Sequence, residues 1–116
     1  MSRRDPTLRM RHMLRYAHAA QKAATGRRRE DLETDEELAF VLIHTVGMIG
    51  EAASHVPSEV RAQYPAVPWP AVVGTRHRLI HGYDEVDLSL LWEIVVRHVP
   101  PLIAELERIL DLEGHA

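Results

Sequence analysis

The sequence predicts an all-α domain, an up-and-down bundle of four long helices plus a short one. Apolar residues recur at spacings of three and four along four long segments, as they do on the buried face of an α-helix. No segment alternates apolar and polar residues in the way that marks a half-buried strand. With 116 residues, the chain suits one domain, and we expect that domain to span residues 1–116.

The first helix is predicted over about residues 7–25. Asp5 suits the N-cap position, and Pro6 suits the first helical position because it has no backbone N–H to satisfy. Gly26 suits the end of the helix because glycine tolerates a positive φ. We expect the arginine-rich residues 26–34 to form a charged loop.

The second helix is predicted to begin at a capping box formed by Thr34 and Glu37. Its apolar stripe continues for about 20 residues, and Pro57 ends it and begins a short helical turn. Two further prolines, Pro65 and Pro68, exclude regular helix in the link that follows.

The third helix is predicted from Trp69 to a stop at Gly82, and it carries the sequence RHRLIHGY at residues 76–83. Arg76 and Tyr83 are seven residues apart, so on one helix they share a face, and that face is apolar. A guanidinium on an apolar face requires a carboxylate, a partner chain or a phosphate.

The last helix is predicted to begin after an N-cap at Asp87. Pro100 and Pro101 interrupt its long apolar stripe, so we expect a kink or break near Val99. Residues 111–116 are expected to form a flexible tail. The stripe is longer than a small bundle needs, which predicts that a homodimer covers the surplus.

Composition excludes some functions and suggests others. The chain has no cysteine, which excludes disulfides and thiolate chemistry. The N-terminus lacks the apolar segment of a signal peptide, and no apolar run approaches the roughly 20 residues of a membrane span, so we expect a cytoplasmic protein without a membrane partner. Residues 1–29 hold nine basic side chains against one acidic one, a pattern that suits contact with a phosphate backbone but also a solvated helix face.

The motif residues suit cleavage of RNA without a metal or another cofactor. Histidine exchanges protons near neutral pH, so His81 can serve as an acid or a base. Arginine binds phosphate through two parallel hydrogen bonds, so Arg76 can stabilise charge that develops on it. RNA supplies the nucleophile in its 2′-hydroxyl. On one straight helix Arg76 and His81 diverge, so they converge only if the helix unwinds at Gly82 or if two chains each contribute one.

Each motif residue also has a structural explanation. His81 suits the C-terminus of a helix, where the helix dipole favours a cation. Arg76 could pair with a carboxylate such as Glu51, and Tyr83 could lie at the edge of an amphipathic face. His77 and His81 are spaced as a metal-binding pair, but the helix offers no third ligand at the right spacing, so we predict no metal site.

The sequence RHRLIHGY resembles the Arg-x4-His-x-Tyr signature of HepT-like toxins in the HEPN superfamily. Residues 44–53, HTVGMIGEAA, resemble the second-helix segment of that family. Residues 64–95 resemble its Pro-Trp segment, motif and following stretch, and HVPPLIAELERIL resembles its closing helix. The resemblance covers most of residues 8–110.

The resemblance implies a dimeric all-α bundle in which the motifs of both chains face one cleft. Such proteins are metal-independent ribonuclease toxins of MntA/HepT-type toxin–antitoxin systems. Arg76 and His81 match the catalytic pair, and Tyr83 matches the tyrosine that a nucleotidyltransferase antitoxin (MntA-like) modifies with AMP. The residue after the arginine is usually asparagine in the family, with aspartate or histidine as variants. His77 stands there instead, and together with Arg78 it is a candidate phosphate ligand.

Two functional hypotheses compete. The first is an endoribonuclease toxin of a type VII-like system, which cleaves RNA through attack of the 2′-hydroxyl and is silenced by AMPylation. The second is a non-catalytic helical partner that holds a nucleotidyltransferase, which predicts a stable complex without RNA cleavage. A metal-dependent hydrolase is a third interpretation, which full activity in excess chelator would remove.

Overall fold

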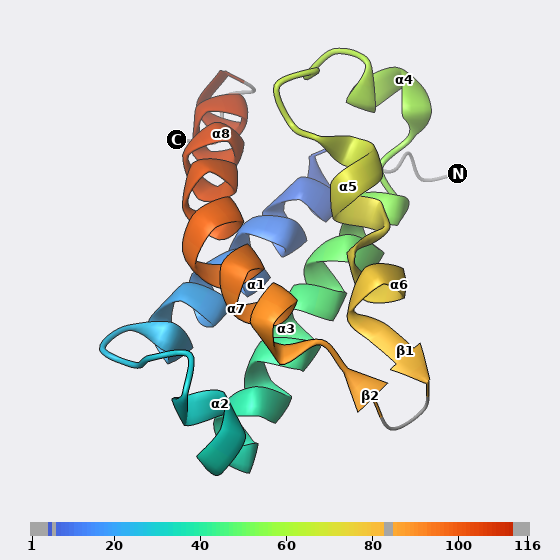
Figure 1. The fold of residues 1–116 in the computed structure, drawn as a ribbon. Coiled ribbons are helices and arrows are strands. Elements are labelled where there is room, and N and C mark those ends of the chain that lie inside the picture. Colours follow the sequence, from blue (N-terminus) through green and yellow to red (C-terminus); the bar gives the residue numbers. More distant parts are fainter. Residues whose placement is uncertain (1–4, 6, 83–84, 113–116) are drawn as a thin grey trace.

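A computed structural model describes residues 5, 7–82 and 85–112 of the chain. These residues are mostly helical (Figure 1), which confirms the predicted class apart from one short hairpin. In chain order the elements are α1 (Leu8–Ala24), α2 (Asp31–Thr34), α3 (Glu36–Ser54), α4 (Ser58–Arg61), α5 (Trp69–Val73), α6 (Thr75–Leu79), β1 (Ile80–Gly82), β2 (Glu85–Val86), α7 (Leu88–Glu93), the π-helix η1 (Ile94–His98) and α8 (Val99–Leu112).

Helix α3 is the centre of the fold. It packs against α1 on one side and against α5 and α6 on the other, while α8 packs against α1 (Figure 1). Apolar side chains fill the space between the helices, and the largest fully buried ones include Met10, Met13, Leu42, Leu79, Leu91, Leu106 and Ile109. Burial of one such side chain stabilises the folded state by about 1.5–3 kcal/mol, so this core holds α3 and its neighbours in place.

Helix α1 begins and ends within a residue of the prediction, but Thr7 takes the N-cap position, so the predicted cap at Asp5 is wrong. The Asp5 carboxylate accepts hydrogen bonds from the Thr7 backbone N–H at 2.9 Å and from the Thr7 hydroxyl at 2.7 Å. Arg11 reaches back to the same carboxylate at 2.7 Å and, together with Thr7, holds the pKa of Asp5 well below its ordinary range. After the helix, Gly26 adopts a φ of +77°, the left-handed conformation expected of it.

The charged loop predicted at residues 26–34 is wrong for its second half, where four residues form α2. Charged side chains pair across this segment: Arg27–Asp31 at 3.5 Å, Arg27–Asp35 at 2.6 Å and Arg29–Glu33 at 2.8 Å. Two of these pairs join residues four apart, a spacing that stabilises a helical turn over an open loop.

The capping box predicted at Thr34 and Glu37 is also wrong. Thr34 is the last residue of α2, and Asp35 caps α3 instead, with its side chain accepting from the Leu38 N–H at 3.1 Å. Aspartate is at least as good an N-cap as threonine, and Arg27 holds the Asp35 carboxylate in place, so the helix begins one residue later than predicted.

The third helix, predicted over residues 69–82, is interrupted at Gly74 and ends three residues earlier than predicted. One residue separates α5 from α6, and α6 already ends at Leu79. Ile80 is extended and pairs antiparallel with Val86 in a two-stranded hairpin. The Leu79 carbonyl accepts from the Asp87 N–H at 2.9 Å, so a later segment supplies the hydrogen bonds that a longer helix would have made.

The last helix starts as predicted, because the Asp87 side chain accepts from the Leu90 N–H at 2.9 Å and caps α7. The break expected near Val99 takes the form of η1, which runs directly into α8. The Val99 N–H donates to the carbonyl of Ile94, five residues back, just before two prolines that have no N–H to donate. Of the tail predicted at residues 111–116, the first two residues belong to α8 and the others lie outside the described part of the chain.

Helix α3 departs from the expectation that no segment could span a membrane. An 18-residue stretch within its 19 residues has a mean hydropathy of 1.3, and the helix meets the length and composition of a membrane span. Half of that stretch is buried inside the fold, as in the core helix of a globular domain. The length and composition of α3 are therefore weak evidence for a membrane span. The absence of a membrane partner stays a prediction.

Candidate functional site

Helix α6 displays motif side chains on the protein surface. Thr75 and Leu79, one helical turn apart, are buried and anchor the helix, and the Thr75 hydroxyl donates to the Ala71 carbonyl at 2.9 Å. Arg76 and the two residues after it are exposed. The prediction that Arg76 points into an apolar stripe is therefore wrong, because α6 stops at Leu79 and its two buried residues set its orientation.

A hollow of about 450 Å³ lies between α3 and α6, and we call it the motif hollow. Arg76 and His77 line it from α6, and Ile80 lines it from the start of β1. The remaining lining residues are Gly47, Gly50, Glu51 and Ser54 of α3 and Val73 of α5. Gly47 and Gly50 carry no side chain, so α3 leaves this side of the hollow open. Arg76 and His77 therefore border an open space on the protein surface.

His81 is exposed on β1 and does not line the motif hollow. The preceding residue, Ile80, does line it, and the strand pairing is irregular between Ile80 and Gly82. One chain therefore does not gather Arg76 and His81 in a single hollow. The explanation of His81 as a residue at a helix C-terminus is wrong, since α6 ends at Leu79. Tyr83, the predicted modification site, lies outside the described residues.

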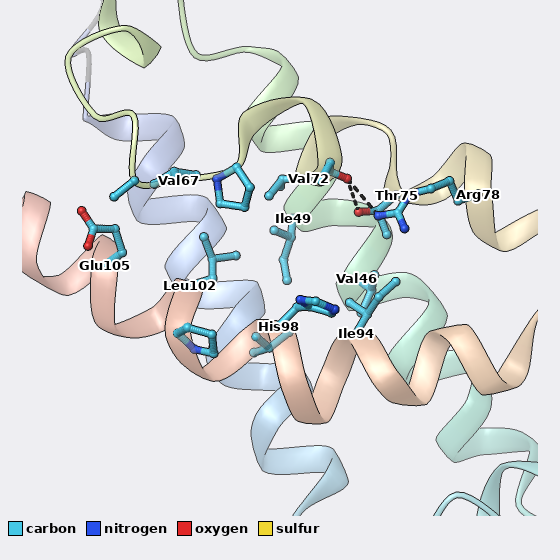
Figure 2. Close-up of a pocket in the computed structure, with 15 residues that line it drawn as sticks. Val46, Ile49, Val67, Val72, Thr75, Arg78, Ile94, His98, Leu102 and Glu105 are labelled. Atoms are coloured by element: carbon cyan, nitrogen blue, oxygen red, sulfur yellow. Dashed lines mark hydrogen bonds between the residues drawn. The ribbon is translucent and has the colours of Figure 1, made fainter.

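Arg78 lies apart from its two neighbours in the motif. It lines a second hollow, of about 360 Å³, between α3, the α5–α6 segment and α8 (Figure 2). The Arg78 guanidinium donates to the Ala71 carbonyl at 3.2 Å, and the same oxygen accepts from Thr75. Arg78 thus ties α6 to α5, and the structure does not bring it together with Arg76 and His77.

The second hollow is mainly apolar. Figure 2 shows Ile49 of α3 facing Leu102 of α8 across it. Glu105 at its rim pairs with Arg108, whose guanidinium lowers the pKa of that carboxyl. Several of its polar side chains already have partners, so this hollow is a poorer candidate for chemistry than the motif hollow.

Sequence reasoning missed a third hollow, of about 190 Å³, on the other flank of α3. We call it the α1 hollow, and its lining residues are Arg9, His12, Arg15, Tyr16, Met48, Glu51, Ala52 and His55. The polar residues of α1 in this group are mostly three and four apart, and that spacing is the signal that could have revealed a shared face.

Glu51 lines both the motif hollow and the α1 hollow. Its carboxylate contacts the His55 ring nitrogen Nε2 at 3.1 Å. Within the described part of the chain it forms no ion pair with Arg76, so the suggested Arg76–Glu51 pair is wrong. Arg76 therefore remains accessible to a ligand that enters the motif hollow.

Metal coordination was the alternative for the two motif histidines. Among residues 5, 7–82 and 85–112, no group of three His, Asp or Glu side chains is placed to hold a metal ion. His77 belongs to α6 and His81 to β1, so the helical i, i+4 arrangement of a metal-binding pair is not formed.

Comparison with known proteins places the chain in a family. A sequence profile described as "Ribonuclease HepT-like" matches residues 13–109. The chain belongs to the HepT-like ribonuclease family. A protein of Caldanaerobacter subterraneus subsp. tengcongensis named "Putative RNase TTE0752" is 30% identical over 102 residues, which cover 88% of this chain and 91% of that protein. The "Probable ribonuclease HepT" of Thermococcus cleftensis is 32% identical over 80 residues, 69% of this chain and 73% of that protein. No solved structure matches the chain.

The resemblance inferred from the sequence is thereby confirmed. The HepT-like match begins inside α1 and ends inside α8, so it contains α3, the motif and the hairpin. It leaves out Arg9 and His12, which line the α1 hollow. All residues that line the motif hollow therefore lie within the HepT-like match, whereas two residues of the α1 hollow come before it.

Proposed function

We propose that this HepT-like ribonuclease is a metal-independent endoribonuclease toxin that acts as a homodimer in a type VII-like toxin–antitoxin system. The observation that carries the proposal is the exposure of Arg76 and His77 beside an open hollow, with His81 exposed on the following strand, in a HepT-like fold. The anchoring of α6 depends on Thr75 and Leu79, so the three exposed side chains are free to contact a substrate.

The proposed reaction uses groups that these side chains and RNA supply. A histidine takes the proton of an RNA 2′-hydroxyl, and the 2′-oxygen forms a bond to the adjacent phosphorus. The bond between phosphorus and the 5′-oxygen breaks, and the protonated histidine returns the proton to that oxygen through solvent. The products are a 2′,3′-cyclic phosphate and a free 5′-hydroxyl. We assign proton transfer to His81, stabilisation of the phosphate charge to Arg76, and further phosphate binding to His77.

Two copies of the chain would let Arg76 and His81 act on one phosphate. In a single chain Arg76 lines the motif hollow and His81 does not. A two-fold axis beside α6 would bring Arg76 and His77 of one protomer towards His81 of its partner.

The proposed partner is an MntA-like nucleotidyltransferase antitoxin that transfers AMP from ATP to Tyr83. The phenolic oxygen of Tyr83 forms a bond to the α-phosphorus of ATP, pyrophosphate leaves, and the phenolic proton passes to solvent. Tyr83 follows His81 by two residues, so the attached phosphate adds negative charge next to the motif and competes with RNA. We place both proteins in the cytoplasm, where RNA and ATP are available.

The test compares wild type, His81→Ala and His98→Ala during expression in bacteria. His98 is an exposed histidine that does not line the motif hollow, so its removal controls for loss of a surface histidine. We expect wild type and His98→Ala to stop growth and degrade RNA, and His81→Ala to do neither. The purified wild type should still cleave RNA in excess chelator. Equal behaviour of wild type and His81→Ala would remove the proposal.

The second candidate is a non-catalytic helical partner of a nucleotidyltransferase. It is favoured by the observation that one chain does not gather Arg76 and His81 in one hollow. Such a protein would form a stable complex with the enzyme, cleave no RNA and tolerate His81→Ala. Growth and RNA integrity in the experiment above therefore separate the two candidates.

A further inference from the structure

The α1 hollow borders the motif hollow across a single helix. Glu51 of α3 lines both hollows, with Arg76 and His77 on one side of it and Arg9 and His12 on the other. An α-helix with its side chains is about 10–12 Å across, a width that a few nucleotides of single-stranded RNA can bridge. A strand that occupies the motif hollow can therefore continue over α3 into the α1 hollow.

The basic residues of the N-terminal segment fall into two groups. Several arginines are held by carboxylates: Arg11 by Asp5, Arg27 by Asp31 and Asp35, and Arg29 by Glu33. Within the described ranges, Arg9 and Arg15 form no ion pair, and the Arg15 guanidinium lies over the Tyr16 ring at 5.4 Å from its centroid. The two arginines of the α1 hollow thus keep their charge available for an anion.

Among the described residues that line the α1 hollow, Glu51 is the one carboxylate, and it contacts His55 at 3.1 Å. The hollow therefore combines two guanidinium groups, two imidazole rings and a single acidic group that already has a partner. A cluster of this kind favours an anion with several oxygen acceptors, such as a phosphodiester, because guanidinium groups donate two parallel hydrogen bonds to phosphate oxygens.

We propose that the α1 hollow is a phosphate-binding subsite for single-stranded RNA, in which Arg9 and Arg15 hold backbone phosphates upstream or downstream of the bond cleaved at the motif. The inference rests on the proposed ribonuclease function and adds to it a second contact region on the substrate. It also gives a role to the basic residues of the N-terminal segment that no nearby carboxylate neutralises.

The experiment measures RNA binding by the full chain with His81→Ala, which leaves the substrate intact. Arg9→Gln/Arg15→Gln is added to that background, since glutamine keeps much of the aliphatic stem. Lys22→Gln/Arg97→Gln is the matched control, because it removes two exposed charges that line neither the motif hollow nor the α1 hollow. The probes are a single-stranded RNA of about 12 nucleotides and a dinucleotide that fills only the motif hollow.

We expect the Arg9/Arg15 double variant to bind the longer RNA about tenfold or more weakly. The slope of log K against log salt should fall by about 1.4, because each phosphate of a single strand that a guanidinium neutralises adds about 0.7 to it. Dinucleotide binding should not change, and the control variant should behave as the parent does. Arg9→Lys/Arg15→Lys should restore most of the salt slope, which separates loss of charge from loss of folding.

Other results would overturn the subsite. An Arg9/Arg15 variant that matches its parent in affinity and salt slope would show that RNA does not reach the α1 hollow. Loss of binding to a nucleotidyltransferase with RNA affinity intact would assign the hollow to a protein partner instead. Absence of RNA binding in the parent, together with absence of cleavage by the wild type, would contradict the proposed function itself.

Discussion

A Cβ atom at Gly50 would lie 2.9 Å from the carbonyl oxygen of Val72, so α3 and α5 approach as closely as a glycine permits. The near atom belongs to the backbone of α5, so rotation of a side chain cannot relieve the contact. The close approach sets the position of α5. Because a single residue, Gly74, separates α5 from α6, it also sets the position of α6 and of Arg76. Gly50 also lines the motif hollow, so the same residue places the motif and keeps the space beside it open.

Gly50→Ala should therefore destabilise the protein. The added methyl group must displace the Val72 carbonyl, and overpacking of this kind costs about 1–3 kcal/mol. Gly47→Ala is the control: its Cβ meets no atom within 4 Å, and alanine favours helix over glycine by about 1 kcal/mol. Thermal melts should show a lower Tm for Gly50→Ala and an unchanged or higher Tm for Gly47→Ala. A Tm for Gly50→Ala at or above that of wild type would contradict the close approach.

Arg76→Ala should abolish RNA cleavage and leave stability within about 0.5 kcal/mol of wild type, because the side chain is exposed and has no ion pair among the described residues. Arg97→Ala, an exposed arginine on η1, should keep full activity. Cleavage assays and thermal melts on both purified variants provide the check. A large fall in Tm for Arg76→Ala would identify it as a structural residue instead.

Co-expression of Arg76→Ala with His81→Ala should restore cleavage if each site takes its arginine and its histidine from different chains. A mixed dimer then contains one site with an intact Arg76 and an intact His81, whereas either variant alone contains none. The measurement is RNA cleavage by the mixed dimer, purified through two different tags. Inactivity of a correctly formed mixed dimer would show that both residues must come from the same chain.

Tyr83→Phe should retain nuclease activity and escape modification by the nucleotidyltransferase. The change removes the oxygen that accepts AMP and keeps the ring. Mass spectrometry after co-expression should detect AMP-sized additions on wild type and none on the variant, which should remain toxic beside the antitoxin. Loss of cleavage in Tyr83→Phe would make the hydroxyl part of the reaction and contradict its role in silencing.

Asp35→Asn should lower stability near neutral pH and lose that effect in acid. The Arg27 guanidinium and the Leu38 N–H hold the pKa of Asp35 below its ordinary value of 3.8. A carboxyl with a lowered pKa in the folded state stabilises the fold above pH 3.8, and this contribution disappears as the pH falls through the folded value. Asparagine keeps a cap oxygen for Leu38 but carries no charge.

The measurement is the difference in Tm between Asp35→Asn and wild type from about pH 7 to about pH 3. The difference should be largest at pH 7 and should shrink below about pH 4. Glu59→Gln removes an exposed carboxylate without an ion pair in the described ranges, and it should follow wild type throughout. A Tm difference for Asp35→Asn that does not change with pH would mean that the Arg27 pair adds nothing to stability.

Local signals in the sequence determined where most of the long helices lie and where several of them begin or end. Periodicity placed α1, α3 and α8, the conformational freedom of Gly26 ended the first helix, and the side chain of Asp87 began the last one. Each of these features depends on residues within a few positions of one another, so the linear sequence contains the information. The motif and its flanking segments also identified the HepT-like family.

Only the tertiary structure decided where the motif helix ends and which way its side chains point. The Leu79 carbonyl bonds to the Asp87 N–H, and Ile80 pairs with Val86, so contacts with a later segment replaced the helix that periodicity predicts. Packing of α1 and α6 on opposite sides of α3 likewise created two hollows that share Glu51. Contacts between separate elements depend on packing and backbone hydrogen bonds across space, which a one-dimensional pattern of apolar residues does not record.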